Sequence, residues 1–177
     1  QPMTMIFKVA GIDNEQFDID RKEDPGFVRA WKAAKARGEV TVPREDVLCF
    51  PGTRKGEWSF NTSRIVQHDA TKVRDVTAAM IEGRRQVGEI VGFLRKHIPS
   101  CRDIILLETA PHIGVRESRR IAADYTVCAE DIMHARPFED VIARGTYFID
   151  IHSPTGEGTV RIDPPKGKWY EIPYRSI

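Results

Sequence analysis

The residues best suited to chemistry lie in one segment, residues 112–120, which has the sequence His-Ile-Gly-Val-Arg-Glu-Ser-Arg-Arg. Three arginines and a glutamate fall within five residues, between the apolar run 104–107 and the strand-like run 121–126. Burying an unpaired guanidinium costs several kcal/mol, so these charges must be paired or directed at a ligand. The planar, permanently charged fork of arginine suits a carboxylate, a phosphate or an anionic ring. The segment predicts either an anion-recognition site or a strand held by ion pairs.

One residue of this segment and three outside it could also contribute to such a site. His152, in the sequence Asp-Ile-His-Ser, and His112 have the side chain whose pKa best suits proton transfer near neutrality. Asn61 and Arg64 follow the strand-like run 57–60, and polar side chains at a strand end can converge on a ligand. The alternatives stay open, because a histidine at a strand end can be a structural hydrogen-bonding group and an asparagine can cap a turn.

Several motifs in the right order resemble a bacterial family of FAD-dependent oxidoreductases, some of whose members have been labelled xanthan lyases. Residues 113–121, Ile-Gly-Val-Arg-Glu-Ser-Arg-Arg-Ile, look like the arginine-rich signature in the middle of that family. The likeness continues in four later segments and in the first strand, at residues 129–132, 138–145, 147–152, 170–175 and 1–7.

The resemblance implies that residues 1–177 are a single substrate-side domain of a longer flavoenzyme. Arg116 or Arg120 would stabilise reduced flavin or hold an anionic substrate, and His152 would remove a substrate proton as hydride leaves; His112, Asn61 and Arg64 would face the substrate or the flavin. FAD is expected in the full-length protein. The Gly-rich turn and helix that bind the FAD pyrophosphate are not recognisable, because Gly156–Arg161 lacks the third glycine and leads into a strand-like run. We therefore expect this chain alone to bind no FAD.

Two other functions remain as alternatives. A polysaccharide lyase needs a cation to neutralise a uronate and a base for the C5 proton, and Arg116, His152 and Tyr174 could fill these roles. A non-catalytic interaction domain is the third reading. None of these readings identifies the substrate, since substrate choice depends on loop geometry.

The charge balance, the cysteine spacing and the apolar runs of the chain indicate which classes of partner it binds. Lys and Arg number 27 against 26 Asp and Glu, so no basic excess predicts nucleic-acid binding. The cysteines at 49, 101 and 128 have no metal-binding spacing, and no apolar run approaches the ~18–20 residues that span a membrane. We expect a cytoplasmic protein without a metal site, with a small-molecule, anionic substrate and the rest of the flavoenzyme as partners, and with strands near its ends that pair with a second copy.

The patterning predicts an α+β fold with a mostly antiparallel sheet. Apolar residues recur at spacings of three and four from Val73 to Ile98, which indicates one long helix over about 69–98. A second helix should begin at Asp24-Pro25 and end at Gly38, and a short helix should begin near 130. Strands are expected at 3–9, 103–107, 114–127, 147–151, 159–162 and 169–174, with a hairpin formed by 47–50 and 57–60. Alternation along 114–127 would place His112, Arg116 and Arg120 on one face.

Overall fold

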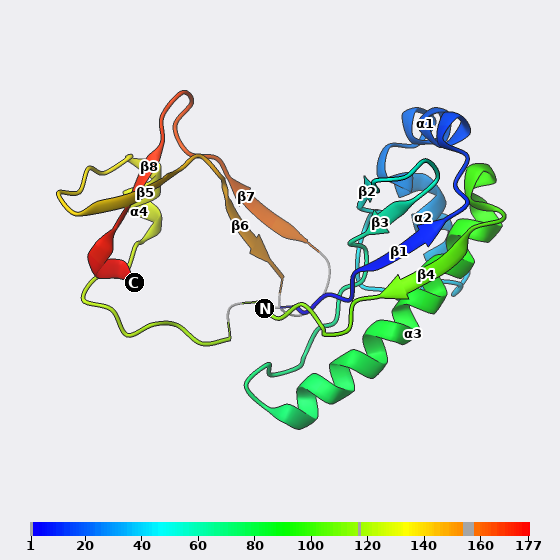
Figure 1. Ribbon diagram of the computed structural model, residues 1–177, viewed down its shortest axis with the longest axis horizontal. Coiled ribbons are helices and arrows are strands. Elements are labelled where there is room, and N and C mark those ends of the chain that lie inside the picture. The colour runs from blue at the N-terminus through cyan, green and yellow to red at the C-terminus, as the bar shows by residue number, and fades with distance from the viewer. Residues whose placement is uncertain (1, 117, 154–157) are drawn as a thin grey trace. The chain divides into compact units, whose positions relative to one another are not determined.

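The computed structural model describes residues 2–116, 118–153 and 158–177, apart from the side chains of His152 and Thr159. The chain divides into two compact units. The first contains Gln1–Ser118 with Pro154–Gly158, and the second contains Arg119–Ser153 with Thr159–Ile177. Each unit is described on its own (Figure 1).

The first unit is built on a four-stranded antiparallel sheet with the order β2-β3-β1-β4. Its strands are β1 (Phe7–Ala10), β2 (Cys49–Pro51), β3 (Trp58–Phe60) and β4 (Ile105–Thr109). The pairing of β2 with β3 confirms the predicted hairpin. Because β1 lies inside the sheet, the N-terminal strand offers no open edge for a second copy, and pairing of two chains stays a prediction.

Three α-helices accompany the sheet: α1 (Asn14–Glu23), α2 (Val28–Ala36) and α3 (Val73–His97). Short 3₁₀ turns, η1 (Pro25–Phe27) and η2 (Pro99–Cys101), precede α2 and follow α3. Helix α1 was not predicted, although Asp13 accepts bonds from the Glu15 and Gln16 amides, as an N-cap does.

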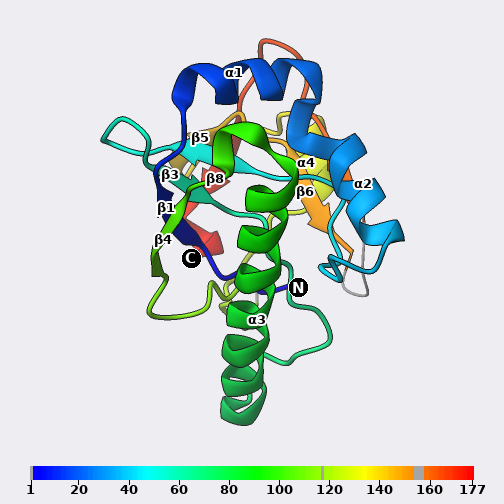
Figure 2. The same ribbon diagram turned by 90° about the vertical axis from the view of Figure 1, so that its right-hand side faces the viewer.

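The long helix α3 packs along one side of the sheet (Figure 2). The predicted apolar stripe is confirmed from Gly83 onward, where Val87, Ile90 and Leu94 are buried. A Cβ added at Gly83 would lie 2.9 Å from the Cβ of Met5, so the glycine permits the close approach of helix and chain. The first turn projects beyond this contact, and Val73 is 82% exposed.

Aromatic contacts join these elements into one core. Phe7 stacks on Phe60 between β1 and β3 with ring centroids 5.2 Å apart. Trp31 of α2 meets Phe93 of α3 edge to face at 4.8 Å. The buried hydrophobic residues of the described chain all lie between Met3 and Ile113, so this core belongs to the first unit.

The second unit consists of two antiparallel strand pairs and a short helix. Strand β5 (Val141–Gly145) pairs with β8 (Tyr170–Pro173), and β6 (Ile149–His152) pairs with β7 (Thr159–Ile162). Helix α4 (Ala129–Met133) and the 3₁₀ turn η3 (Tyr174–Ser176) complete it. These elements confirm the predicted short helix and the last three predicted strands, whereas β5 was not predicted.

The predicted strand over 114–127 is wrong. Among the described residues of this stretch, Gly114 alone forms a bridge, and its partner is Thr4 rather than β4. Arg119 and Arg120 are exposed, and neither belongs to a strand. Strand β4 pairs with β1 instead. The fold class itself, α+β with mostly antiparallel sheets, is confirmed.

Candidate functional site

A hollow of about 360 Å³ lies in the first unit where three segments meet. The first segment is the chain entering β1, the second follows β3, and the third follows β4. The lining residues are Thr4, Ile6, Asn61, Ala110, His112, Gly114, Val115 and Arg116. The volume is near the lower end of the range for small-molecule pockets, ~300–1,000 Å³. Three of the residues predicted from sequence, Asn61, His112 and Arg116, therefore border one space.

The segment after β3 is held in place largely by side-chain hydrogen bonds. The Asn61 amide donates to the Leu48 carbonyl at 2.9 Å, and the Thr62 hydroxyl bonds both the amide and the carbonyl of Leu48. The Ser63 hydroxyl likewise accepts from the Met5 amide at 2.7 Å and donates to the Met5 carbonyl at 3.0 Å. These bonds replace the strand pairing that ends at Phe60, and they fix Asn61 at the rim of the hollow.

The segment after β4 is held against the entry to β1. The Gly114 amide donates to the Thr4 carbonyl at 2.7 Å, and the Thr4 amide donates to the Gly114 carbonyl at 3.1 Å. A Cβ at position 114 would lie 3.1 Å from the Thr4 carbonyl oxygen, which makes glycine the residue that fits this approach. His112 and Arg116 flank Gly114 by two residues on either side, and both line the hollow.

The polar groups at the hollow are available to a ligand. The side chains of Asn61, His112 and Arg116 make no hydrogen bond or ion pair with any residue that the structure describes. His112 and Arg116 are exposed, and Asn61 is partly buried. Ile6, Ala110 and Val115 supply the apolar part of the lining. An amide, an imidazole and a guanidinium beside an apolar wall can bind a small molecule with one polar or anionic end.

Arg64 occupies a different place from the one predicted. Its side chain is 5% exposed and does not line the hollow, and Nη1 lies 3.8 Å from Oε2 of Glu45. Gln86 holds its backbone by accepting from the Arg64 amide at 2.9 Å and donating to its carbonyl at 3.1 Å. Burial lowers the pKa of the Arg64 guanidinium, nearby Arg44 lowers it further, and Glu45 opposes both. Arg116 is also close enough to lower this pKa.

The other candidates from the sequence stay predictions. Arg120 and His152 belong to the second unit, and the side chain of His152 lies outside the described residues. Tyr174, named for the lyase reading, also belongs to the second unit, whereas Arg116 belongs to the first. The three lyase candidates therefore fall in different units, and that assignment stays a prediction.

Sequence reasoning missed Thr4, Ile6 and Ala110 among the lining residues. A signal existed for Thr4 and Ile6, because Met3, Met5 and Phe7 are at most 1% exposed while Thr4 and Ile6 alternate with them. Strict alternation places these two side chains on the opposite face of the strand from the core. Glu45, which contacts Arg64, carried no comparable signal.

The described residues do not fit the pyrophosphate half of FAD. A pyrophosphate cradle combines a Gly-rich turn with free amides at a helix N-terminus behind a parallel strand. Every strand pair in the described chain is antiparallel, and the N-termini of α1 and α2 bind their own carboxylates, from Asp13 and Asp24. Gly158 leads directly into β7 rather than into a helix, as predicted, while residues 154–157 lie outside the described chain.

The chain matches one protein family over its whole length. The family model described as FAD dependent oxidoreductase covers residues 1–177. The chain therefore belongs to the FAD-dependent oxidoreductases, which confirms the resemblance seen in the sequence; the match says nothing of a lyase. Neither the curated proteins nor the solved structures gave a match.

Metal ions and membranes are two further classes of partner. Within residues 2–116, 118–153 and 158–177, His, Cys, Asp and Glu form no group of three that could hold a metal ion. In that same part of the chain, no helix combines the length and the apolar character needed to cross a membrane.

Proposed function

We propose that this chain is the substrate-side part of an FAD-dependent oxidoreductase, and that the hollow bordered by Asn61, His112 and Arg116 binds the substrate. Family membership supports the oxidoreductase class and the dependence on FAD. The substrate-side role follows from the polar residues at the hollow and from the lack of a pyrophosphate cradle in the described chain.

The observation that carries the proposal is the convergence of three uncommitted polar side chains. They come from positions 61, 112 and 116, and no described residue satisfies their hydrogen-bonding capacity. Buried polar side chains usually find hydrogen-bond partners, and the partly buried Asn61 side chain has none among the described residues. The bonds that Thr62, Ser63 and Gly114 make serve instead to fix the backbone around the hollow.

Each group has a distinct chemical capacity. The Arg116 guanidinium can hold an anionic group with two parallel bonds. The His112 imidazole can accept or donate a proton at a substrate hydroxyl or amine. The Asn61 amide can donate and accept at the same time. FAD is the electron acceptor in the family's reaction. These residues bind and orient the molecule that is oxidised.

The test uses the FAD-loaded enzyme that carries this chain. Hydroxy acids, amino acids and simple alcohols are screened for anaerobic reduction of the flavin, which bleaches its absorbance. Arg116→Ala should slow reduction by the active compound about 10²-fold, the scale of one oriented electrostatic donor. Arg116→Lys should restore only part of the rate, because lysine lacks the fork.

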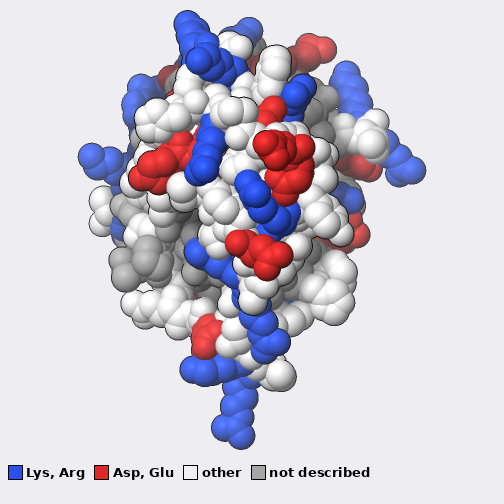
Figure 3. All heavy atoms as spheres, turned by 90° about the vertical axis from the view of Figure 1, so that its left-hand side faces the viewer, with Lys and Arg blue, Asp and Glu red and all other residues white. Residues whose placement is uncertain are grey.

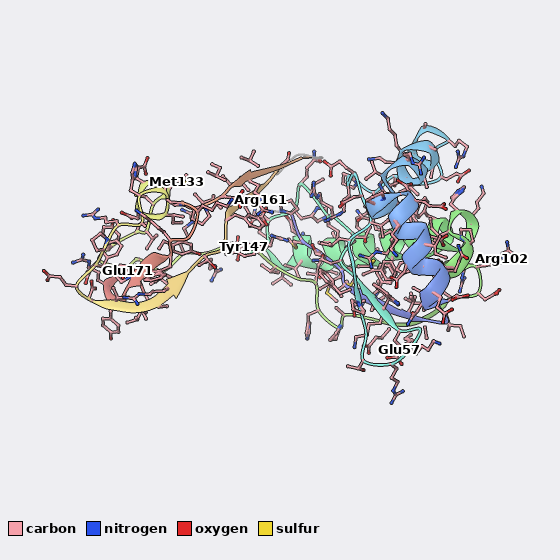
Figure 4. All side chains as sticks on the ribbon, turned by 90° about the horizontal axis from the view of Figure 1, so that it is seen from above. Glu57, Arg102, Met133, Tyr147, Arg161 and Glu171 are labelled. Carbon is pink, nitrogen blue, oxygen red and sulfur yellow. The ribbon has the colours of Figure 1, made fainter. Side chains whose placement is uncertain are left out.

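The matched control is Arg102→Ala. Arg102 is an exposed arginine of the same unit that follows η2 and does not line the hollow (Figure 4). The flavin of the Arg102→Ala enzyme should be reduced at the parental rate. Unchanged rates in Arg116→Ala, Asn61→Ala and His112→Ala together would refute the assignment of the hollow as the substrate site.

A further inference from the structure

The connection between β7 and β8 lines a hollow of about 700 Å³ in the second unit (Figure 1). The lining includes Lys166, Lys168 and Trp169, together with two prolines at positions 164 and 165. We propose that this hollow binds a phosphate monoester that carries an aromatic ring, which is the chemistry of a nucleoside monophosphate. The proposal gives the chain a second ligand and does not rest on the assignment of the hollow in the first unit.

Trp169 presents a flat apolar surface that is held in place. The Arg144 guanidinium lies 5.2 Å from the ring centroid, and Nη2 of Arg144 lies 3.2 Å from Oε1 of Glu171. The other carboxylate oxygen of Glu171 accepts from the Phe138 amide at 2.9 Å. Trp169 is still 51% exposed and lines the hollow. An exposed aromatic side chain is a common stacking partner for a nucleotide base, because every base has a flat π face.

Lys166 and Lys168 bring two positive charges to the same hollow. The Lys168 amide donates to the Pro165 carbonyl at 3.0 Å, which closes a turn around Lys166 and Gly167. Gly167 has a φ of 76°, a conformation that favours glycine, so the sequence fixes this turn with one lysine on either side of the glycine. Neither ammonium group makes a hydrogen bond or an ion pair with a residue that the structure describes. Both are therefore available to an anion.

Two lysines beside one aromatic ring favour a phosphate monoester over other anions. A phosphate monoester carries about −1.5 to −2 charges at neutral pH, which two ammonium groups balance, whereas a carboxylate needs one. A sugar acid would also need partners for its hydroxyl groups. The lining offers two further polar side chains, Thr146 and Asp163, and Asp163 is already bonded to Arg161 at 2.7 Å. The indole and the two prolines instead form an apolar wall that suits a planar ring.

The test follows the indole signals of the protein labelled with ¹⁵N-tryptophan. The indoles of Trp31 and Trp58 donate to the Arg44 carbonyl and to Asn14 in the first unit, so they are internal references. Adenosine monophosphate (AMP), adenosine and inorganic phosphate are titrated separately. AMP should shift the Trp169 signal alone. It should bind at least tenfold more tightly than adenosine, which lacks the charge, and than phosphate, which lacks the ring. Its affinity should fall at high salt, because the lysines are exposed.

Three variants assign the binding to this hollow. The double variant Lys166→Gln/Lys168→Gln should bind AMP no more tightly than adenosine. Trp169→Ala, followed through the Gly167 amide signal, should bind AMP about tenfold more weakly and phosphate as before. The matched control is Lys55→Gln, because Lys55 is also an exposed turn lysine followed by a glycine at positive φ, and it lies in the first unit. The control should bind AMP like the parent. The amide signals of β5 and β8 show whether each variant keeps the second unit folded, and if one variant does not, the other decides.

Several outcomes would overturn the proposal. Equal affinities for AMP and adenosine would remove the role of the lysines, and equal affinities for AMP and phosphate would remove the role of the ring. A loss in Lys55→Gln as large as in the double variant would show unspecific attraction. Tighter binding of digalacturonate than of AMP would identify a sugar-acid site instead, and a Trp169 signal that no probe shifts would mean that the hollow binds none of them. The flavin-reduction assay on Arg116→Ala tests the substrate hollow separately, so the failure of one proposal leaves the other standing.

Discussion

The two units of this chain are stabilised in different ways. The first buries a continuous hydrophobic core, in which Phe7, Trp31 and Phe60 are at most 1% exposed. In the second, the buried positions among the described residues are Asp131 and Pro173, and no large hydrophobic side chain is buried. The comparison shows that one family domain can combine a part held by apolar burial with a part held by polar and aromatic contacts.

The contacts in the second unit are specific even without a core. Tyr125 and Phe138 meet edge to face at 5.3 Å, and the guanidinium groups of Arg136 and Arg175 lie within 6 Å of both rings. Asp131 accepts from the Tyr125 hydroxyl at 2.7 Å. On the face shown in Figure 3, Lys and Arg side chains are interspersed with Asp and Glu side chains. Such contacts contribute ~0.5–1 kcal/mol each at exposed sites, less than a buried aromatic side chain does.

Several hydrophobic residues of the second unit remain exposed on its surface. Ile151, Val160 and Ile162 share one face of the β6–β7 hairpin and are 38–55% exposed. A two-stranded hairpin is marginally stable by itself in water. The second unit is therefore expected to open at lower free energy than the first.

The largest expected effect tests the core directly. Phe60→Ala should lower the free energy of unfolding by ~3–5 kcal/mol, because it leaves a cavity beside Phe7. Trp169→Ala in the second unit should cost less than ~1 kcal/mol, since Trp169 is 51% exposed and its main partner is the Arg144 guanidinium at 5.2 Å. Urea unfolding followed by circular dichroism measures both, and equal losses would contradict the contrast between the units.

The second effect concerns the packing of α3. Gly83→Ala should destabilise the first unit by ~1–3 kcal/mol, since the new Cβ would lie 2.9 Å from the Cβ of Met5. Gly88→Ala is the control on the same helix, because no atom lies within 4 Å of its added Cβ. The control should stabilise by ~0.5–1 kcal/mol through helix propensity. Thermal unfolding of the two variants should shift in opposite directions, and a shift in the same direction would show that α3 is loosely packed.

The third effect probes the polar centre of the second unit. Burial by itself would raise the pKa of Asp131, but hydrogen bonds from the Cys128 amide, the Tyr125 hydroxyl and Arg136 outweigh it and lower the pKa. The stabilisation is therefore complete above the unfolded pKa of ~4 and is lost as the pH falls through the lower folded value. Asp131→Asn should cost ~1–3 kcal/mol at neutral pH and remove this pH dependence.

Hydrogen exchange of the amides around α4 between pH 3 and neutrality gives the measurement for Asp131. The amides of β1 and β3 in the first unit serve as the internal reference. If exchange around α4 in the parent protein showed the same pH dependence as in Asp131→Asn, the carboxylate would have no stabilising role.

The smallest effect is expected at the surface of the β6–β7 hairpin. Arg161 pairs with Asp163 at 2.7 Å and lies 3.9 Å from the centroid of the Phe148 ring, near Tyr147 (Figure 4). Arg161→Gln should destabilise the hairpin least of these variants, and the loss should shrink at high salt because the ion pair is exposed. The hydrogen-exchange rates of the β7 amides at low and high salt measure this loss of stability. A loss that does not depend on salt would point to the contact between Arg161 and the Phe148 ring instead.

Local patterns in the sequence determined much of the fold. The apolar spacing from Val73 to Ile98 specified α3, and the turn between residues 50 and 57 specified the β2–β3 hairpin. These features are readable because each depends on near neighbours in the chain. Helix α1 was missed because its apolar face has a single buried residue, Phe17, so its cap at Asp13 was the stronger signal.

Only the tertiary structure decided which segments pair and which candidate residues meet. Residues 114–127 have the composition of a strand, but among the described residues of this stretch Gly114 alone forms a bridge, and its partner is Thr4 in the chain that enters β1. Asn61, His112 and Arg116 were candidates by residue type, and their convergence at one hollow depends on the hydrogen bonds that hold Thr4, Met5 and Leu48. Arg64 was a candidate of the same standing and is buried beside Glu45, because burial depends on contacts between residues distant in sequence, which local patterns do not encode.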